Sequence, residues 1–139
     1  MVDVYRAPMR SLRAELAATV DHARSRGLVG FDDGPPDERL TRRIARFEAV
    51  DNGSFVWTRD ESGLYWLGRI DGPYRYEPDG AAVGLVHVRP CRWMAEPLLE
   101  PDVPAAVLAT FRRGGRNFQQ THDPDVGARS RRLWERQRR

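Results

Sequence analysis

The sequence contains no lysine, because all 23 of its basic residues are arginine. This absence excludes a P-loop, a Schiff-base enzyme and the lysine-dependent nuclease sites, since each needs a side-chain amine. The single cysteine, Cys91, excludes an internal disulfide and a zinc site built from cysteine clusters. Long apolar runs are also missing, so we expect neither a membrane span nor a secretory signal, and we expect a cytoplasmic protein.

Groups suited to catalysis are few. The three histidines, His22, His87 and His122, lie far apart and lack the spacing of a metal or nuclease motif. His122 precedes Asp123 and Asp125, but such a cluster is more typical of a turn and a helix cap. No serine or threonine stands in a glycine-framed elbow. We therefore expect a protein that is not an enzyme and that holds no metal and no cofactor.

Length and charge permit one domain with a polyanionic partner. A chain of 139 residues can bury one real core but is short for two. The net charge of +3 and the isoelectric point near 9.6 are mildly basic. Such a balance allows binding to a polyanion without requiring it.

The first fifty residues have helical periodicity. Apolar residues recur every three or four positions over residues 11–27, with Ser11 as a possible N-cap and Gly27 as a stop. A second helix begins near Asp37, after a Gly-Pro-Pro sequence, and ends near residues 51–53. Its polar side is either a solvated face or a surface close to nucleic-acid phosphate, and it carries Arg39, Arg42, Arg43 and Arg46. The sequence predicts a helical segment over residues 1–52, packed on the same domain.

The period changes to two after residue 53. Strands are predicted over residues 54–58, 64–70 and 87–94, the first two joined by a hairpin loop. Pro90 lies inside the third strand and favours an edge position or a bulge, because proline cannot donate to the ladder. Further on, we expect a helix over residues 102–111, a basic loop over 112–116, a strand over 117–121 that closes the sheet, and a final helix over 125–139.

Aromatic residues gather in the middle of the chain. Six of the eight tyrosines and tryptophans lie between positions 57 and 93. Some are needed to fill a small barrel, so core packing is the alternative for each ring. Tyr65 and Trp66 point to opposite faces of a strand, and Tyr74 and Tyr76 share a face beyond the Asp-Gly-Pro turn at residues 71–73. Rings interleaved with arginines are suited to stacking a nucleobase while guanidinium groups hold flanking phosphates.

Three segments together resemble a known family. They are residues 53–57 (GSFVW), residues 65–76 (YWLGRIDGPYRY) and residues 87–93 (HVRPCRW). In order and spacing they resemble the PUA-like, EVE-related domains of bacterial modification-dependent restriction proteins, which show a strand, a Tyr-x-x-Gly-x-Ile-x-Gly-x-Tyr segment and an Arg-x-Val-x-Trp strand. The resemblance covers residues 53–122, with Cys91 in place of the usual aliphatic residue.

The resemblance implies an α+β fold: a small PUA-like β-barrel with flanking helices over residues 53–139, preceded by the N-terminal helical segment. It implies a reader of modified cytosine, 5-methylcytosine above all, that flips the base out of double-stranded DNA into an aromatic pocket. The candidates for this pocket are Trp57, Tyr65, Trp66, Tyr74, Tyr76 and Trp93. The candidates for phosphate or base-edge contacts are Arg69, Arg75, Arg89, Arg92 and Arg113.

Family members usually carry a nuclease or an NTPase beside the reader, and this chain offers neither. We therefore expect binding without cleavage. The N-terminal helices then cap the barrel, form a homodimer interface or meet a separate effector subunit. Two alternatives remain open: a PUA-like domain that binds RNA, and a regulatory interaction protein in which the aromatic residues are core.

Overall fold

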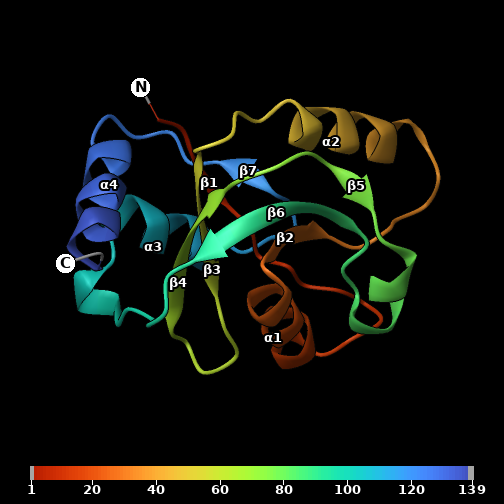
Figure 1. Ribbon diagram of the computed structural model, residues 1–139, viewed down its shortest axis with the longest axis horizontal. Helices are drawn as coiled ribbons and strands as arrows, with labels where there is room; N and C mark the ends of the chain where they lie inside the picture. The colour runs from red at the N-terminus through yellow and green to blue at the C-terminus, as the bar shows by residue number, and fades with distance from the viewer. Residues whose placement is uncertain (1, 138–139) are drawn as a thin grey trace.

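The computed structural model describes residues 2–137 and shows an α+β fold built on one curled, mixed sheet (Figure 1). The strands follow the order β2-β6-β4-β3-β1-β7, and β5 pairs with β6 outside this path. Their bounds are β1 Val4–Arg6, β2 Leu28–Phe31, β3 Phe55–Arg59, β4 Tyr65–Ile70, β5 Arg75–Tyr76, β6 His87–Trp93 and β7 Gln119–Gln120. The helices are α1 Leu16–Arg26, α2 Glu38–Glu48, α3 Ala105–Arg112 and α4 Val126–Gln137, with 3-10 turns at Pro78–Val83 and Glu100–Asp102.

The centre of the sheet is the part that the sequence predicts best. The three predicted strands correspond to β3, β4 and β6, and β3 and β4 form the expected hairpin, with Trp57 opposite Leu67. Gly68 of β4 lies close to the side chains of the neighbouring strand β6, because a Cβ atom at this position would lie 2.6 Å from the Cys91 sulfur. Glycine is therefore needed at this position for packing rather than for a turn.

The helical segment expected over residues 1–52 contains two helices, but residues 1–52 also supply two strands that were not predicted. β1 pairs in parallel with β3, placing Val4 opposite Phe55, and β2 pairs antiparallel with β6, placing Val29 opposite Arg89. These strands have three and four residues, too few to show a period in the sequence. Helices α1 and α2 lie where helical periodicity predicts them.

Local capping sets the ends of these two helices. The Asp37 carboxylate accepts hydrogen bonds from the backbone N–H groups of Arg39 and Leu40, at 2.9 and 3.2 Å, and so begins α2. α1 ends at Gly27, whose φ of +66° is left-handed. Ser11 is not its N-cap, because the Ser11 hydroxyl donates to the Asp32 carboxylate and the helix begins at Leu16.

Pro90 lies on a strand with neighbours on both sides, so of the two predicted alternatives, an edge position or a bulge, the edge position is wrong. β6 has β2 on one side and β4 with β5 on the other. The Pro90 carbonyl accepts a hydrogen bond from Asp71 N–H just after β4 ends. Proline has no N–H, so one hydrogen bond between strands is missing here. It is missing where residues 71–73, which follow β4, turn away from β6.

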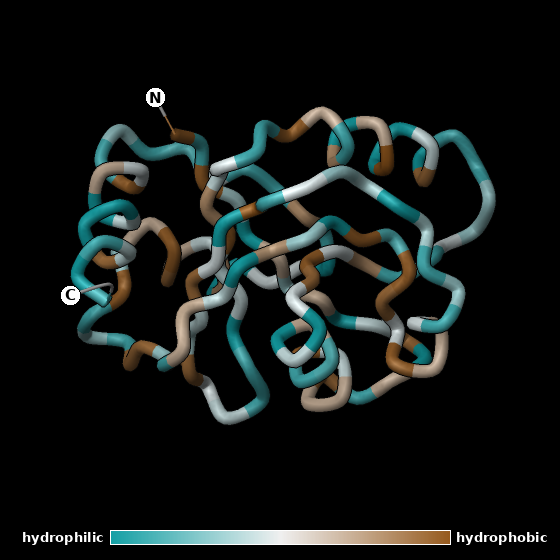
Figure 2. Tube along the Cα trace, viewed as in Figure 1, coloured by the Kyte–Doolittle hydropathy of each residue, from teal (hydrophilic) through white to brown (hydrophobic). Residues whose placement is uncertain are grey.

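Both faces of the sheet are covered. Helices α1 and α2 contribute Val20, Ala23 and Phe47 to one core cluster. On the opposite side, α3 and α4 contribute Val107, Leu133 and Trp134 to a second. Brown hydrophobic residues alternate with teal and white ones along the strands as well as along the helices (Figure 2). The division into two clusters means that side chains on either face of a central strand become buried.

The C-terminal elements agree in type with their predictions and differ at their ends. α3 begins three residues later than expected, after Pro104, and α4 is anchored by the buried Leu133 and Trp134. Residues 138 and 139 of the predicted final helix lie outside the described residues. β7 pairs with β1 and is the end strand of the path, so the sheet is curled but is not closed by a pairing between β7 and β2 within residues 2–137. No helix in this range is long and apolar enough to span a bilayer.

Candidate functional site

Three of the six predicted pocket aromatics lie in the protein interior. Trp57 is fully buried, and its indole Nε1–H donates to the Ser130 hydroxyl at 3.1 Å. Tyr65 is 2% exposed and packs edge-on against Phe111, with ring centroids 5.7 Å apart. Trp66 is covered by the Arg24 guanidinium, which lies 3.3 Å above its ring centroid. In this conformation the faces of these rings are already occupied by protein atoms.

The other three aromatics lie nearer the surface. Trp93 is half-buried, and its Nε1–H donates to the Leu28 carbonyl at 2.9 Å. Tyr74 is half-buried, and Tyr76 is 52% exposed. Among the described residues, the six rings are therefore not gathered around one cavity, and only Tyr74 and Tyr76 meet, around the His87 imidazole.

The Asp33 carboxylate is hydrogen-bonded to His87 and to Tyr76, and His87 is in turn hydrogen-bonded to Tyr74. Its Nδ1 lies 2.8 Å from the Tyr74 hydroxyl, and its Nε2 lies 2.6 Å from the Asp33 carboxylate. Tyr76 donates to the same carboxylate at 3.4 Å. Burial, followed by the charges of Glu48 and Asp33, raises the pKa of Tyr74. Tyr74, the two ring nitrogens of His87 and Asp33 thus form one continuous hydrogen-bond chain, which ties the loop after β2 to β6.

The predicted phosphate-contacting arginines are mostly engaged within the protein. Arg89 is 3% exposed and donates to the carbonyls of Gly72, Phe47 and Val50 and to the Asn52 side chain. Burial lowers its pKa. Its guanidinium therefore holds the C-terminal end of α2 and the turn after β4.

The remaining four predicted arginines differ in exposure. Arg69 donates to the Gly53 carbonyl at 3.0 Å and lies over the Phe55 ring. Arg75 and Arg92 are more exposed and form ion pairs with Glu77, at 3.0 Å, and with Asp71, at 3.5 Å. Arg113 is exposed just after α3. The structure brings Arg69 and Arg92 together, since they pair across β4 and β6 and each guanidinium lies 5.9 Å from the Trp134 ring centroid. It does not gather all five predicted arginines around one site.

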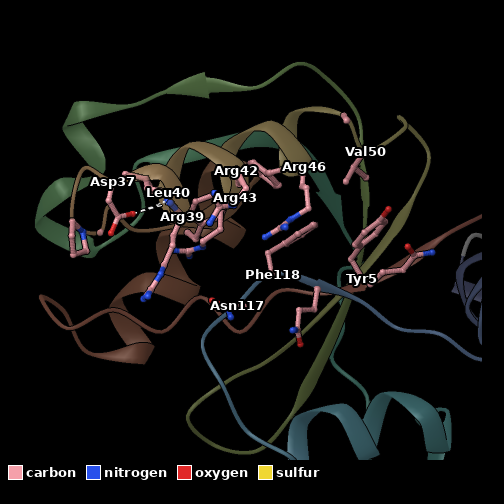
Figure 3. Close-up of a pocket in the computed structure, with 17 residues that line it drawn as sticks. Tyr5, Asp37, Arg39, Leu40, Arg42, Arg43, Arg46, Val50, Asn117 and Phe118 are labelled. Atoms are coloured by element: carbon pink, nitrogen blue, oxygen red, sulfur yellow. Dashed lines mark hydrogen bonds between the residues drawn. The ribbon is translucent and has the colours of Figure 1, made fainter.

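A large cleft lies elsewhere, between α2 and the segment that contains β7 (Figure 3). Its volume is about 1010 Å³, which is ample for a nucleotide. We call it the α2–β7 cleft. Its lining consists of α2 and the approach to it, β1, β2 and residues 117–120, and includes Tyr5, Phe31, Arg39, Arg42, Arg43, Arg46, Phe47, Asn117, Phe118, Gln119 and Gln120.

One wall of the cleft is strongly basic. Arg39, Arg42, Arg43 and Arg46 line it from successive turns of α2. Arg42 has a weak ion pair with Glu38, at 3.5 Å, whereas Arg39 and Arg46 have no acidic partner within 4.0 Å among residues 2–137. Burial and the neighbouring Arg46 lower the pKa of Arg43, whose guanidinium lies 4.6 Å from the Phe31 ring centroid. This wall can therefore attract and hold an anion.

Aromatic rings form the base of the cleft. Phe118 stacks on Tyr5 with ring centroids 5.1 Å apart and packs edge-on against Phe47 at 4.9 Å. Phe47 is buried, while Tyr5 and Phe118 are half-buried. Figure 3 shows Arg46 extending from α2 toward Phe118. Flat apolar surface and guanidinium groups thus meet in one cavity, a combination that suits planar anionic ligands such as nucleotides.

The wall opposite α2 carries amides. Asn117, Gln119 and Gln120 are exposed, line the cleft and offer both donors and acceptors. The buried Arg6 fixes this wall, since its guanidinium donates to the carbonyls of Thr110, Gly114 and Asn117. Within residues 2–137, no group of three histidine, cysteine or acidic side chains is placed to hold a metal ion.

Reasoning from sequence identified one wall of this cleft and missed the rest. The arginines of α2 stand out in the sequence as a possible phosphate surface. Tyr5 and Phe118 are single aromatic residues near opposite ends of the chain, and they meet only because β1 pairs with β7. No spacing rule within either segment connects them.

Comparisons with known proteins leave the family open. No protein-family model matches this chain, and no curated protein matches it. Two solved chains match, among them the X-ray crystal structure of protein Atu2648 from Agrobacterium tumefaciens. That match has a TM-score of 0.47 and 10% sequence identity, and it covers 94% of this chain and 92% of the other.

Proposed function

We propose that this protein is a DNA-binding reader of modified cytosine with a PUA-like fold, and that it takes a flipped base into the α2–β7 cleft without cleaving the DNA. The ligand class follows from the resemblance of residues 53–122 to modified-base readers. The α2–β7 cleft supports the position proposed for the site. The base pocket is accordingly assigned to the half-buried rings of Tyr5 and Phe118 rather than to the buried rings of β3 and β4.

A single observation carries this assignment: stacked aromatic rings and unpaired arginines line the same nucleotide-sized cavity. The accessible Phe118 ring offers stacking surface, and Arg39 and Arg46 have no acidic partner within residues 2–137. The base would stack on the rings while the arginines hold phosphates on either side of it. The amides of Asn117, Gln119 and Gln120 would then face the hydrogen-bonding edge of the base.

The energies are compatible with such a mechanism. Flipping a base costs a few kcal/mol in lost stacking and pairing. Stacking on an aromatic side chain returns about 1–3 kcal/mol per base, and each charge-assisted contact to phosphate adds to it. A methyl group contributes only about 0.8 kcal/mol through apolar burial, which corresponds to roughly fourfold discrimination. A larger preference requires a closely shaped site around the methyl group.

The test is a binding titration with fluorescent duplexes of one sequence that differ only in one cytosine: unmodified, methylated or hydroxymethylated. We expect the modified duplexes to bind more tightly at physiological salt. Equal affinity for all three would contradict modified-base reading. Matching single-stranded and structured RNAs serve as competitors, and RNA that outcompetes every duplex would assign the cleft to RNA instead.

Two variants locate the site. Phe118→Ala removes stacking surface from the α2–β7 cleft, whereas Tyr76→Ala removes the exposed ring of the surface predicted from the sequence. We expect the first to weaken binding and the second to leave it unchanged. The opposite result would place the base near His87.

A further inference from the structure

A second, smaller cavity lies beyond the ends of β1 and β3, close to the C-terminal end of α3. Its volume is about 80 Å³. A water molecule needs only about 10–15 Å³ of such space, so a small polyatomic ion fits. Three arginines and no acidic residue line this cavity, and its full lining is Arg6, Pro8, Arg10, Arg59, Phe111, Gly114 and Gly115. We call it the Arg6 cavity.

Arg6 brings a buried positive charge to this cavity. The residue is 5% exposed, and its Nε and Nη1 donate to the carbonyls of Asn117, Thr110 and Gly114 at 2.7–3.3 Å. Within residues 2–137, no carboxylate lies within 4.0 Å of it, and its Nη2 makes no hydrogen bond. Burial and the nearby Arg113 lower its pKa. Carbonyl dipoles solvate this guanidinium but do not neutralise it, and a buried uncompensated charge is costly.

The backbone leaves the remaining donor accessible. Gly115 has a φ of +104°, and a Cβ atom at this position would lie 2.8 Å from Arg6 Nη2. Glycine thus opens the space that Nη2 faces. On the other side, Met9 adopts a φ of +54° and buries its side chain, while the neighbouring Arg10 is exposed at the cavity.

Arg10 and Arg59 complete the ring of positive charge. Both are exposed, and neither has an acidic partner within 4.0 Å in the part of the chain that the structure describes. The Arg59 guanidinium lies 5.9 Å from the Tyr65 ring centroid, on the hairpin between β3 and β4. Three guanidinium groups around one small space repel one another, and an anion between them would relieve this repulsion.

We propose that the Arg6 cavity binds one phosphate group. A tetrahedral oxyanion presents several acceptors and can accept from three guanidinium groups that approach from different elements, namely β1, the loop after it and the end of β3. This site is separate from the α2–β7 cleft, and its lining shares no residue with that cleft. It therefore stands whether or not the cleft reads a modified base.

The first experiment titrates inorganic phosphate into the full chain at constant ionic strength, with chloride as the balancing anion, and follows the amide signals of Gly114 and Gly115 by NMR. We expect saturable shifts. Arg59→Gln and Arg10→Gln should each weaken phosphate binding about tenfold, as expected for loss of a charge-assisted contact. Arg26→Gln, which removes an exposed arginine at the end of α1, should change nothing. Shifts that do not saturate, or equal shifts in all four proteins, would overturn the site.

The second experiment identifies the source of the phosphate. If the group belongs to a nucleic-acid backbone, inorganic phosphate will compete with duplex DNA, and Arg59→Gln will lower the salt dependence of DNA binding by about one unit of slope. If it is a free phosphate, the wild-type protein will still show saturable NMR shifts with inorganic phosphate, and Arg59→Gln will leave the affinity for DNA and its salt dependence unchanged. If Phe118→Ala does not alter DNA binding, the proposed base site in the cleft is wrong. Both experiments on the Arg6 cavity keep their meaning in that case.

Discussion

Tyr5 and Phe118 stack almost in parallel, with 13° between their ring planes, although they come from opposite ends of the chain. Tyr5 belongs to β1, and Phe118 immediately precedes β7, so the antiparallel pairing of Tyr5 with Gln120 brings the two rings together. The base of the α2–β7 cleft is therefore a product of sheet topology. Any change that separates β7 from β1 will dismantle it.

Replacement of Phe118 by alanine should reduce the affinity for duplex DNA with a modified base by about 5- to 150-fold, because one stacked ring is worth about 1–3 kcal/mol. The ring is half-buried, so the free energy of unfolding should fall by only about 2 kcal/mol, less than for a core phenylalanine. Anisotropy titration and urea denaturation measure the two effects. Leu16→Ala, at a half-buried residue of α1 outside the cleft, is the control. An equal loss of affinity in that variant would show that stability alone is responsible.

The double variant Arg39→Gln/Arg46→Gln should weaken binding to modified and unmodified DNA alike. Each lost phosphate contact lowers the slope of log affinity against log salt by about 0.9, so a reduction of about 2 is expected. Titrations at several salt concentrations give this slope. The matched control is Arg75→Gln/Arg92→Gln, which removes two exposed arginines that are already paired with acidic residues. If only the control pair lowers the slope, the phosphates lie on the surface predicted from the sequence.

Arg89→Met should destabilise the fold by about 2–5 kcal/mol. The substitution keeps an unbranched apolar stem but leaves the carbonyls of Gly72, Phe47 and Val50 without their donor. The midpoint of urea unfolding measures this change. Arg92→Met, at an exposed position on the same strand, should stay within about 0.5 kcal/mol of the wild type. A neutral Arg89→Met would mean that water replaces the guanidinium as the donor to these carbonyls.

Stability should fall in acid through Asp32. Burial tends to raise the pKa of this carboxyl, but hydrogen bonds from Arg13 and Ser11 prevail and hold it below the ordinary value of 3.8. A depressed pKa contributes stability above the unfolded value, and this contribution is lost as pH falls through the folded value. The loss therefore lies below about pH 4.

Urea denaturation across this range should show a smaller acid loss in Asp32→Asn than in the wild type. Asp21→Asn, at an exposed residue of α1, should follow the wild type. An identical pH profile for the wild type and Asp32→Asn would show that other carboxyl groups control acid unfolding.

The sequence predicts elements well where one element carries its own pattern. The strands β3, β4 and β6 and the start of α2 near Asp37 are predicted from local signals, and the structure confirms these elements. β1 and β2 are stabilised by partners far away in the chain and have no pattern of their own. Pro90 is tolerated inside the sheet for a similar reason. The hydrogen bond that its missing N–H cannot donate falls where β4 ends, and the sequence of β6 does not encode where β4 ends.

The predicted pocket aromatics differ from the structure for another reason. Tyr65 and Trp66 do point to opposite faces, as alternation predicts. Neither becomes available, since α3 covers the side of Tyr65 and Arg24 of α1 covers Trp66. Alternation identifies two faces of a strand but not whether a helix lies over each. Tyr5 and Phe118 require a knowledge of β1–β7 pairing that no segment of the sequence contains.

Each wall of the α2–β7 cleft is held by a buried arginine acting on backbone carbonyls: Arg89 at the end of α2, and Arg6 at the segment before β7. Neither arginine depends on which side chains project into the cleft from those segments. The backbone contacts of these two arginines therefore set the width of the cavity, whereas other side chains set which groups it can bind. On the function proposed above, exchanging residues 117, 119 and 120 would change the base that is recognised while the frame around them keeps its dimensions, so the fold would then serve as a scaffold for readers of other nucleobase modifications.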